Sequence, residues 1–217
     1  MKKLVIFDLD GTLLDTIEDL GNATNYALRT LGFPERKRDE FYQLVGRGIT
    51  NLLKGAVPEG FDTEEVIAQM RKHFFDHYGI HLCDRTHPYP GIPELLEHIT
   101  GKGVRIAVAS NKYQEGAETV VSHFFGRFPL VTVLGQREGV PLTPDPAIVE
   151  LCRDAAGVTR DDILYVGDSN VDMQTGQNAG VDTVGVTWGF RSRGELEAFR
   201  PMAVVDHPAE LEKIILG

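Results

Sequence analysis

Four aspartates stand at spacings that suit a hard cation and nucleophilic attack by a carboxylate. Asp8 and Asp10 lie two residues apart after an apolar run, and Asp168 and Asp172 follow another such run. A single aspartate after a strand is often only a turn former or a helix cap. If the fold gathers all four, their charges repel one another unless a cation neutralises them. Oxygen ligands with room for water favour Mg²⁺.

The elements that must position these residues alternate between strands and helices. We expect buried strands at residues 3–7, 104–109, 130–134, 163–166 and 182–186, with a weaker strand at 203–205. Helical spacing covers residues 93–100, 114–125, 145–156, 171–179 and 210–216. This alternation predicts an α/β fold with a doubly wound, mostly parallel sheet and helices on both faces.

Three strand ends in this scheme carry polar side chains. Asp8 and Asp10 follow the first strand, Ser110 and Asn111 follow the second, and Asp168 follows the strand at 163–166. Ligands of parallel α/β sheets bind beyond the carboxyl ends of the strands. The sequence therefore predicts that these residues meet at one edge of the sheet.

A helical insertion separates the first strand from the rest. Residues 15–84 show helical spacing at about 17–31, 39–53 and 63–78, and no clear strand. We therefore predict a helical cap at residues 15–85, inserted into a discontinuous core made of residues 1–14 and 86–217. Because the two ends of the cap should enter the core close together, the cap can close as a lid that excludes water.

Charge and hydropathy argue against two classes of partner. The formal net charge is −10 at pH 7, which disfavours binding to nucleic acid or anionic lipid. No apolar run reaches the ~18 residues of a membrane span, and the N-terminal run is shorter than the ~7–15 apolar residues of a secretory signal. We expect a cytoplasmic protein, a monomer or homodimer, that does not bind membranes.

Three motifs resemble those of the haloacid-dehalogenase-like hydrolase superfamily. Residues 8–13 read DLDGTL, residues 109–111 read ASN, and residues 167–172 read GDSNVD. A lone DxD is a weak signal, but DLDGT after an N-terminal strand together with GDSxxD near residue 170 is specific. Within the superfamily, the helical insertion and the late segment 186–190, VTWGF, look most like the phosphoglycolate phosphatase branch.

The resemblance implies roles for the aspartates. Asp8 would be the nucleophile that forms an aspartyl-phosphate, and Asp10 the general acid and then the general base. Mg²⁺ would be held by Asp8, by the backbone carbonyl of Asp10 and by Asp168. Asp172 would lie in the second shell or bind the ion through water. Dehalogenases of the superfamily lack the second acid, so Asp10 favours phosphate chemistry.

The resemblance also implies a phosphate site, with one departure. Ser110 and the backbone N–H of Asn111 would bind the phosphate, but Thr143 stands where the third motif normally supplies a lysine. Three interpretations stay open. In the first, Lys112 or Arg137, each near a strand end, supplies the charge. In the second, the enzyme is weakened, since losing one preorganised charge commonly costs on the order of 10²–10³ in rate. In the third, the position was changed by design or error.

We therefore expect a Mg²⁺-dependent phosphatase that acts on a small phosphorylated metabolite, with phosphoglycolate as the leading candidate. Arg47, between Gly46 and Gly48, is a tentative cap residue that would grip a substrate carboxylate. Two alternatives remain. One is a phosphosugar mutase of the same superfamily, and the other is a non-catalytic phosphate-ligand-binding module, which the replacement by Thr143 favours.

Overall fold

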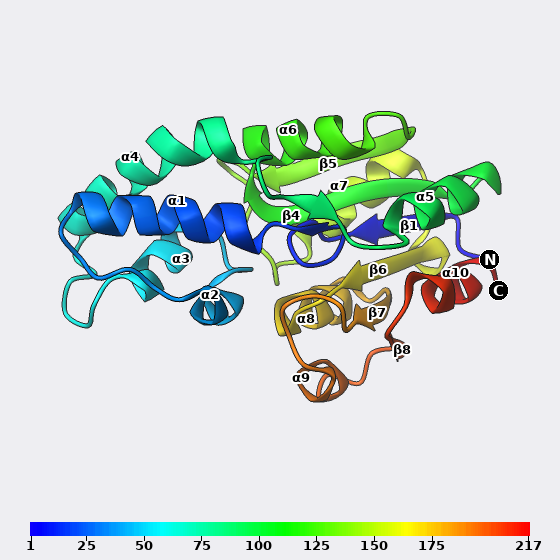
Figure 1. The fold of residues 1–217 in the computed structure, drawn as a ribbon. Coiled ribbons are helices and arrows are strands. Elements are labelled where there is room, and N and C mark those ends of the chain that lie inside the picture. Colours follow the sequence, from blue (N-terminus) through cyan, green and yellow to red (C-terminus); the bar gives the residue numbers. More distant parts are fainter.

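A six-stranded parallel sheet forms the centre of the molecule (Figure 1). The computed structural model describes residues 1–217, and the strand order is β5-β4-β1-β6-β7-β8. The strands are β1 (Leu4–Phe7), β4 (Arg105–Tyr113), β5 (Leu130–Gln136), β6 (Ile163–Gly167), β7 (Asp182–Val186) and β8 (Ala203–Val205). All neighbouring strands in this sheet run parallel. The predicted α/β fold class is confirmed.

Helices cover both faces of the sheet because side chains alternate along each strand. Val5 and Phe7 of β1 join the larger apolar cluster, and Leu4 and Ile6 join a separate, smaller one. The helices that follow the cap are α5 (Ile92–Gly101), α6 (Gln114–Phe125), α7 (Ala147–Ala156), α8 (Asn170–Ala179), α9 (Arg193–Glu197) and α10 (Pro208–Leu216), and a 3₁₀ helix spans Arg160–Asp162. The larger cluster includes residues of α5, α6 and α10, whereas the smaller includes residues of α7 and α8.

Four helices occupy the segment predicted as the cap. They are α1 (Ile17–Thr30), α2 (Arg38–Leu44), α3 (Ile49–Ala56) and α4 (Glu64–His81). The prediction of a single helix at 39–53 is wrong, because residues 45–48 interrupt the helix between α2 and α3. Gly46 and Gly48 have φ angles of 113° and 79° there, values that favour glycine and end a helix. The exact division of the chain into cap and core stays a prediction.

A two-stranded antiparallel sheet, which the sequence did not reveal, joins the cap to the rest of the chain. Its strands are β2 (Leu14–Asp15) and β3 (His87–Pro88). Beside it, the buried Asp19 carboxylate of α1 accepts hydrogen bonds from the backbone N–H groups of Arg85 and Thr86 and from the Thr86 hydroxyl. The chain therefore leaves and re-enters the core through adjacent strands.

The helices also bear on the membrane question. None of them combines the length and apolar character needed to cross a bilayer.

Candidate active site

A cavity lies between the carboxyl edge of the sheet and the segment of residues 17–81, where residues of α1, α3 and α4 line it. The predicted site residues that line it are Asp8, Asp10, Ser110, Asn111, Thr143 and Asp172. β1 pairs with both β4 and β6 in register, so the ends of these three strands open at the same level.

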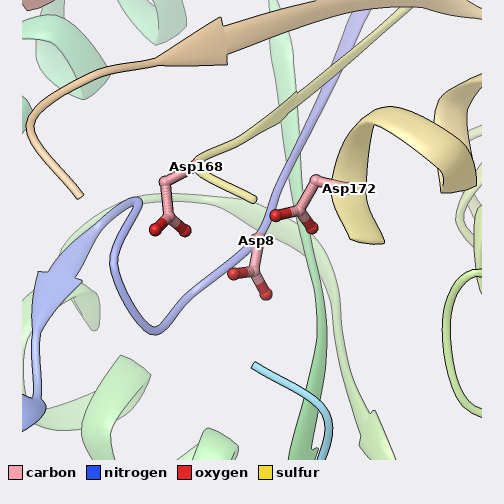
Figure 2. Close-up of side chains that lie close together, drawn as sticks. All are labelled: Asp8, Asp168 and Asp172. Atoms are coloured by element: carbon pink, nitrogen blue, oxygen red, sulfur yellow. The ribbon is translucent and has the colours of Figure 1, made fainter. Parts of the chain in front are cut away.

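Asp8, Asp168 and Asp172 form an acidic trio (Figure 2), of which Asp8 and Asp172 line the cavity and Asp168 does not. One carboxylate oxygen from each lies within 4.8 Å of the others. Asp168 and Asp172 are buried and Asp8 is half-buried. Three converging carboxylates are the hard oxygen donors that suit Mg²⁺. The trio therefore fits the cation that the sequence predicted.

Asp168 is held in place from two sides. The backbone N–H of Phe190 donates to its Oδ2 at 2.6 Å, and the Thr12 hydroxyl donates to its Oδ1 at 3.2 Å. Two glycines let the backbone approach the same carboxylate. A Cβ at Gly11 would lie 2.5 Å from Oδ2 and one at Gly189 would lie 2.4 Å from it. Side chains at these two positions would displace the carboxylate.

Asp172 belongs to the first turn of α8. Its Oδ2 accepts hydrogen bonds from the backbone N–H and the hydroxyl of Ser169, at 3.0 and 2.6 Å, in a capping box. Its Oδ1 accepts one from the Tyr165 hydroxyl at 3.4 Å. The sequence predicted that Asp172 either supports the ligands of the ion or binds the ion through water. The structure places its carboxylate next to those of Asp8 and Asp168, and its role stays a prediction.

Burial and mutual repulsion make the trio basic. Burial, with the charge of Asp172, raises the pKa of Asp168 to about 7. Burial raises the pKa of Asp172 to about 6. The pKa of Asp8 lies well above its ordinary value, because of burial and of the charges of Asp172, Asp168 and Asp10. A divalent cation would offset both effects because it stabilises the ionised carboxylates, which supports the fit of Mg²⁺.

The Asp10 carboxylate is not part of the trio and pairs with Lys112 instead. Lys112 Nζ donates to Asp10 Oδ1 at 3.1 Å and to the Tyr78 hydroxyl oxygen of α4 at 2.6 Å. Although burial alone would lower the pKa of the Lys112 ammonium, the Asp10 carboxylate holds it above its ordinary value. Arg137, the other candidate cation, does not line the cavity, and its guanidinium donates to Gln114 Oε1.

Ser110 and Asn111 lie within the last part of β4, not after it. The strand is longer than predicted, and its pairing with β5 is irregular between Ala109 and Tyr113. The Asn111 side chain donates to the Gly46 carbonyl at 3.0 Å and accepts from the Thr143 N–H at 3.0 Å. It therefore ties the α2–α3 break of the cap to the third-motif loop.

The cap contributes an apolar roof with one polar group. Its lining side chains are those of Leu20, Val45, Ile49, Leu52 and Tyr78, beside the backbone of Gly46 and Gly48. Arg47 does not line this cavity, although both neighbours do. Its side chain is exposed and borders a separate surface hollow with Asn170 and Arg191. The glycines on either side bring the backbone to the cavity and leave the Arg47 side chain outside it.

Two groups at the site were absent from the sequence-based reasoning. Tyr78 falls on the buried face of α4 with Met70 and Phe74, so its spacing indicates only core packing. The Phe190 N–H is a backbone group, and no residue type marks it. The VTWGF segment was the one available signal, and it indicated a resemblance to a branch of the superfamily and not a contact with Asp168.

Comparison with known proteins agrees with the motifs. The family described as haloacid dehalogenase-like hydrolase matches residues 5–186. A phosphoglycolate phosphatase of Aquifex aeolicus is 30% identical over 98% of this chain and 96% of its own length. One from Pseudomonas putida is 32% identical over 95% of this chain and 77% of its own. The resemblance predicted from the three motifs is confirmed.

A solved structure agrees as well. A candidate phosphoglycolate phosphatase from Lactobacillus delbrueckii subsp. bulgaricus superimposes with a TM-score of 0.92 at 33% identity, over the full length of both chains. The family match and the named relatives confirm the predicted enzyme class, a phosphoric monoester hydrolase.

Proposed function

Because the chain belongs to the haloacid dehalogenase-like hydrolases, we propose that it is a Mg²⁺-dependent phosphatase that works through an aspartyl-phosphate on Asp8. The observation that carries the proposal is the position of Asp8, which belongs to the carboxylate trio and lines the same cavity as Asp10. Phosphoglycolate is the leading substrate, since the relatives named above are phosphoglycolate phosphatases.

Asp8 and Asp10 divide the chemistry between them in this proposal. A carboxylate oxygen of Asp8 attacks phosphorus, and the bond from phosphorus to the ester oxygen breaks. Asp10, which takes up a proton before this step, gives it to the leaving alkoxide. Asp10, now a carboxylate, takes a proton from water, whose oxygen attacks the phosphoryl group. Phosphate leaves and the Asp8 carboxylate is restored.

The residues around Asp8 prepare it for this role. We propose that Asp8, the backbone carbonyl of Asp10 and Asp168 hold Mg²⁺, with Asp172 beside them. The ion would supply positive charge that offsets the repulsion between the nucleophile and the phosphate. The hydrogen bonds from Thr12 and from the Phe190 N–H fix the orientation of Asp168. Such fixed partners keep ligand oxygens in place.

The phosphate and the remainder of the substrate would occupy opposite ends of the cavity. We propose that the Ser110 hydroxyl, the Asn111 N–H and the Thr143 side chain bind the phosphoryl group. The cap end is apolar apart from the Tyr78 hydroxyl and the start of α3, where Gly48 and Ile49 line the cavity. The first N–H groups of a helix lack intrahelical partners and attract anions. A small carboxylate such as that of glycolate suits this end.

Hydrolysis fits the observations better than the alternatives do. The relatives named above are phosphatases by name, which favours hydrolysis over a mutase reaction. A binding module without turnover has no need of both the acidic trio and the Asp10–Lys112 pair. A cytoplasmic location and a monomeric or homodimeric state stay predictions.

Phosphate release tests the proposal. The native protein with Mg²⁺ should release phosphate from phosphoglycolate and, less efficiently, from p-nitrophenyl phosphate. Asp8→Asn should lower kcat by at least about 10⁴-fold, because it removes the nucleophile and leaves the shape of the side chain. A chelator should abolish release and added Mg²⁺ should restore it. Release that survives Asp8→Asn would refute the proposed nucleophile.

A further inference from the structure

Lys112 is the one cationic side chain among the 15 residues that line the cavity. Its side chain is only 2% exposed, and its Nζ lies 3.1 Å from Asp10 Oδ1 and 2.6 Å from the Tyr78 hydroxyl. The cavity otherwise presents the carboxylates of Asp8, Asp10 and Asp172 to an incoming phosphate. Lys112 is therefore the lining side chain that can place a positive charge against the phosphate.

We propose that Lys112 is a catalytic residue that supplies the charge missing at Thr143, and that Tyr78 of the cap holds it in place. The inference rests on the proposed function, because it concerns charge at the reacting phosphate. It resolves the three interpretations of Thr143 in favour of a lysine placed elsewhere in the same cavity.

The donors of Lys112 leave room for a phosphate oxygen. An ammonium group has three N–H donors, and Lys112 Nζ contacts the Tyr78 hydroxyl and both oxygens of the Asp10 carboxylate, Oδ1 at 3.1 Å and Oδ2 at 3.5 Å. One N–H can serve both oxygens of a single carboxylate, which leaves the third for a phosphate oxygen. Lys112 and Thr143 line the same cavity, and Asn111, the residue before Lys112, accepts the Thr143 N–H. The two positions therefore lie on adjoining segments of one phosphate-facing wall.

The position of the Lys112 charge depends on the cap because Tyr78, the second partner of Lys112, belongs to the cap helix α4. Tyr78 is fully buried on α4, and Lys112 Nζ also lies 4.9 Å from the centre of its ring. A ring face attracts a cation and the hydroxyl oxygen accepts a hydrogen bond from it, so both contacts fix the ammonium position. If the cap swings away, Lys112 loses both contacts. Closure would thus complete the charge as well as exclude water.

A set of substitutions tests the inference with phosphoglycolate and Mg²⁺. Lys112→Met removes the charge and keeps an unbranched side chain, so we expect kcat to fall about 10²–10³-fold. Thr143→Lys in that background should raise kcat at least tenfold, a larger factor than the same change gives in the native protein, where Lys112 already supplies a charge. Arg137→Met is the matched control for loss of a cation and should change kcat less than threefold.

Tyr78→Phe tests the part of the cap. It keeps the ring and removes only the hydroxyl, so we expect kcat to fall by about tenfold and KM to change less. Thr143→Lys should recover this loss too, because a lysine at 143 does not need Tyr78. If Lys112→Met does not fold, as judged by thermal unfolding, the Tyr78→Phe pair gives the same comparison. Inhibition by inorganic phosphate should weaken in Lys112→Met and recover with Thr143→Lys.

The outcomes separate this inference from the proposed function. If the native protein is active and Lys112→Met keeps more than a third of its kcat, Lys112 does not supply the charge. Equal acceleration of both backgrounds by Thr143→Lys would also refute the inference, since the native site would then lack a charge of its own. A native protein that is inactive until Thr143→Lys is introduced would refute it while the phosphatase chemistry stands. If neither protein releases phosphate, both proposals fail.

Discussion

Without a bound cation, the carboxyl groups of the acidic trio keep their protons to a higher pH in the folded protein than in the unfolded chain. The pKa of Asp168 is about 7 and that of Asp172 about 6, both raised by burial, whereas unfolded aspartates titrate near 3.8. Between about pH 5 and 7 the unfolded chain has therefore lost protons that the folded chain retains. The unfolded state then binds fewer protons, so the free energy of unfolding decreases as pH rises through this window.

This sign gives a prediction for the metal-free protein. Its melting temperature should fall between pH 5 and 7, at a cost on the order of 1 kcal/mol per pH unit for each group still protonated. Mg²⁺ should raise the melting temperature most at pH 7 and above, where the carboxylates are ionised. Asp172→Asn should flatten the metal-free curve. A metal-free melting temperature that rises over the same window would contradict the raised pKa values.

Sequence reasoning at this scale found the residues that a motif can mark. Asp8, Asp168 and Asp172 converge as the strand ends required. The sequence did not identify the partner of Asp10, because the Lys112–Asp10 contact joins positions 102 residues apart and depends on the irregular pairing at the end of β4. Both Lys112 and Arg137 lie near strand ends in the sequence, and only the side-chain directions in the fold distinguish them.

At the scale of elements, a loop of the core grips a helix of the cap. The buried Arg191 guanidinium donates to the backbone carbonyls of Tyr42 and Val45, at the C-terminal end of α2. The last carbonyls of a helix lack intrahelical donors and carry partial negative charge, which favours an arginine there. The neighbouring Phe190 N–H binds Asp168, so one loop contacts both the acidic trio and the cap.

We predict that Arg191→Ala loosens the closed cap. The change leaves buried carbonyls without donors, so the free energy of unfolding should fall by about 2–4 kcal/mol. Amide hydrogen exchange should increase at residues 43–49, and KM for phosphoglycolate should rise several-fold because the closed state is less populated. Arg193→Ala, which removes an exposed arginine two residues away, is the control. Equal amide hydrogen exchange at residues 43–49 in Arg191→Ala and Arg193→Ala would contradict the role of Arg191 in holding the cap closed.

The elements themselves were predicted unevenly, for physical reasons. The buried strands have continuous apolar runs, as LVIF in β1 does, and such runs mark a parallel sheet covered on both faces. The break between α2 and α3 was missed because helical spacing continues across Gly46 and Gly48. The hinge strands β2 and β3 contain two residues each, too few to show any period.

At the scale of the whole molecule, the cap and the sheet edge together enclose the reaction site. The sheet edge supplies the carboxylates and the lysine, and the cap supplies an apolar roof with the Tyr78 hydroxyl. The lysine in this arrangement matters because the formal net charge is −10, and a surface with that charge repels an anionic substrate as a whole. The alternation of strands and helices predicted the sheet, whereas the closed fit between cap and sheet depends on tertiary packing that no local pattern records.

The most direct test of the account is the detection of a phosphoryl group on Asp8 during turnover. The native protein would be mixed with phosphoglycolate and Mg²⁺, quenched in acid within milliseconds to seconds, digested and analysed by mass spectrometry. The peptide that contains Asp8 should carry the mass of one phosphoryl group, and Asp8→Asn should abolish it. Turnover at the native rate with an unmodified Asp8 peptide at every quench time, or with the phosphoryl group on another residue, would contradict the account.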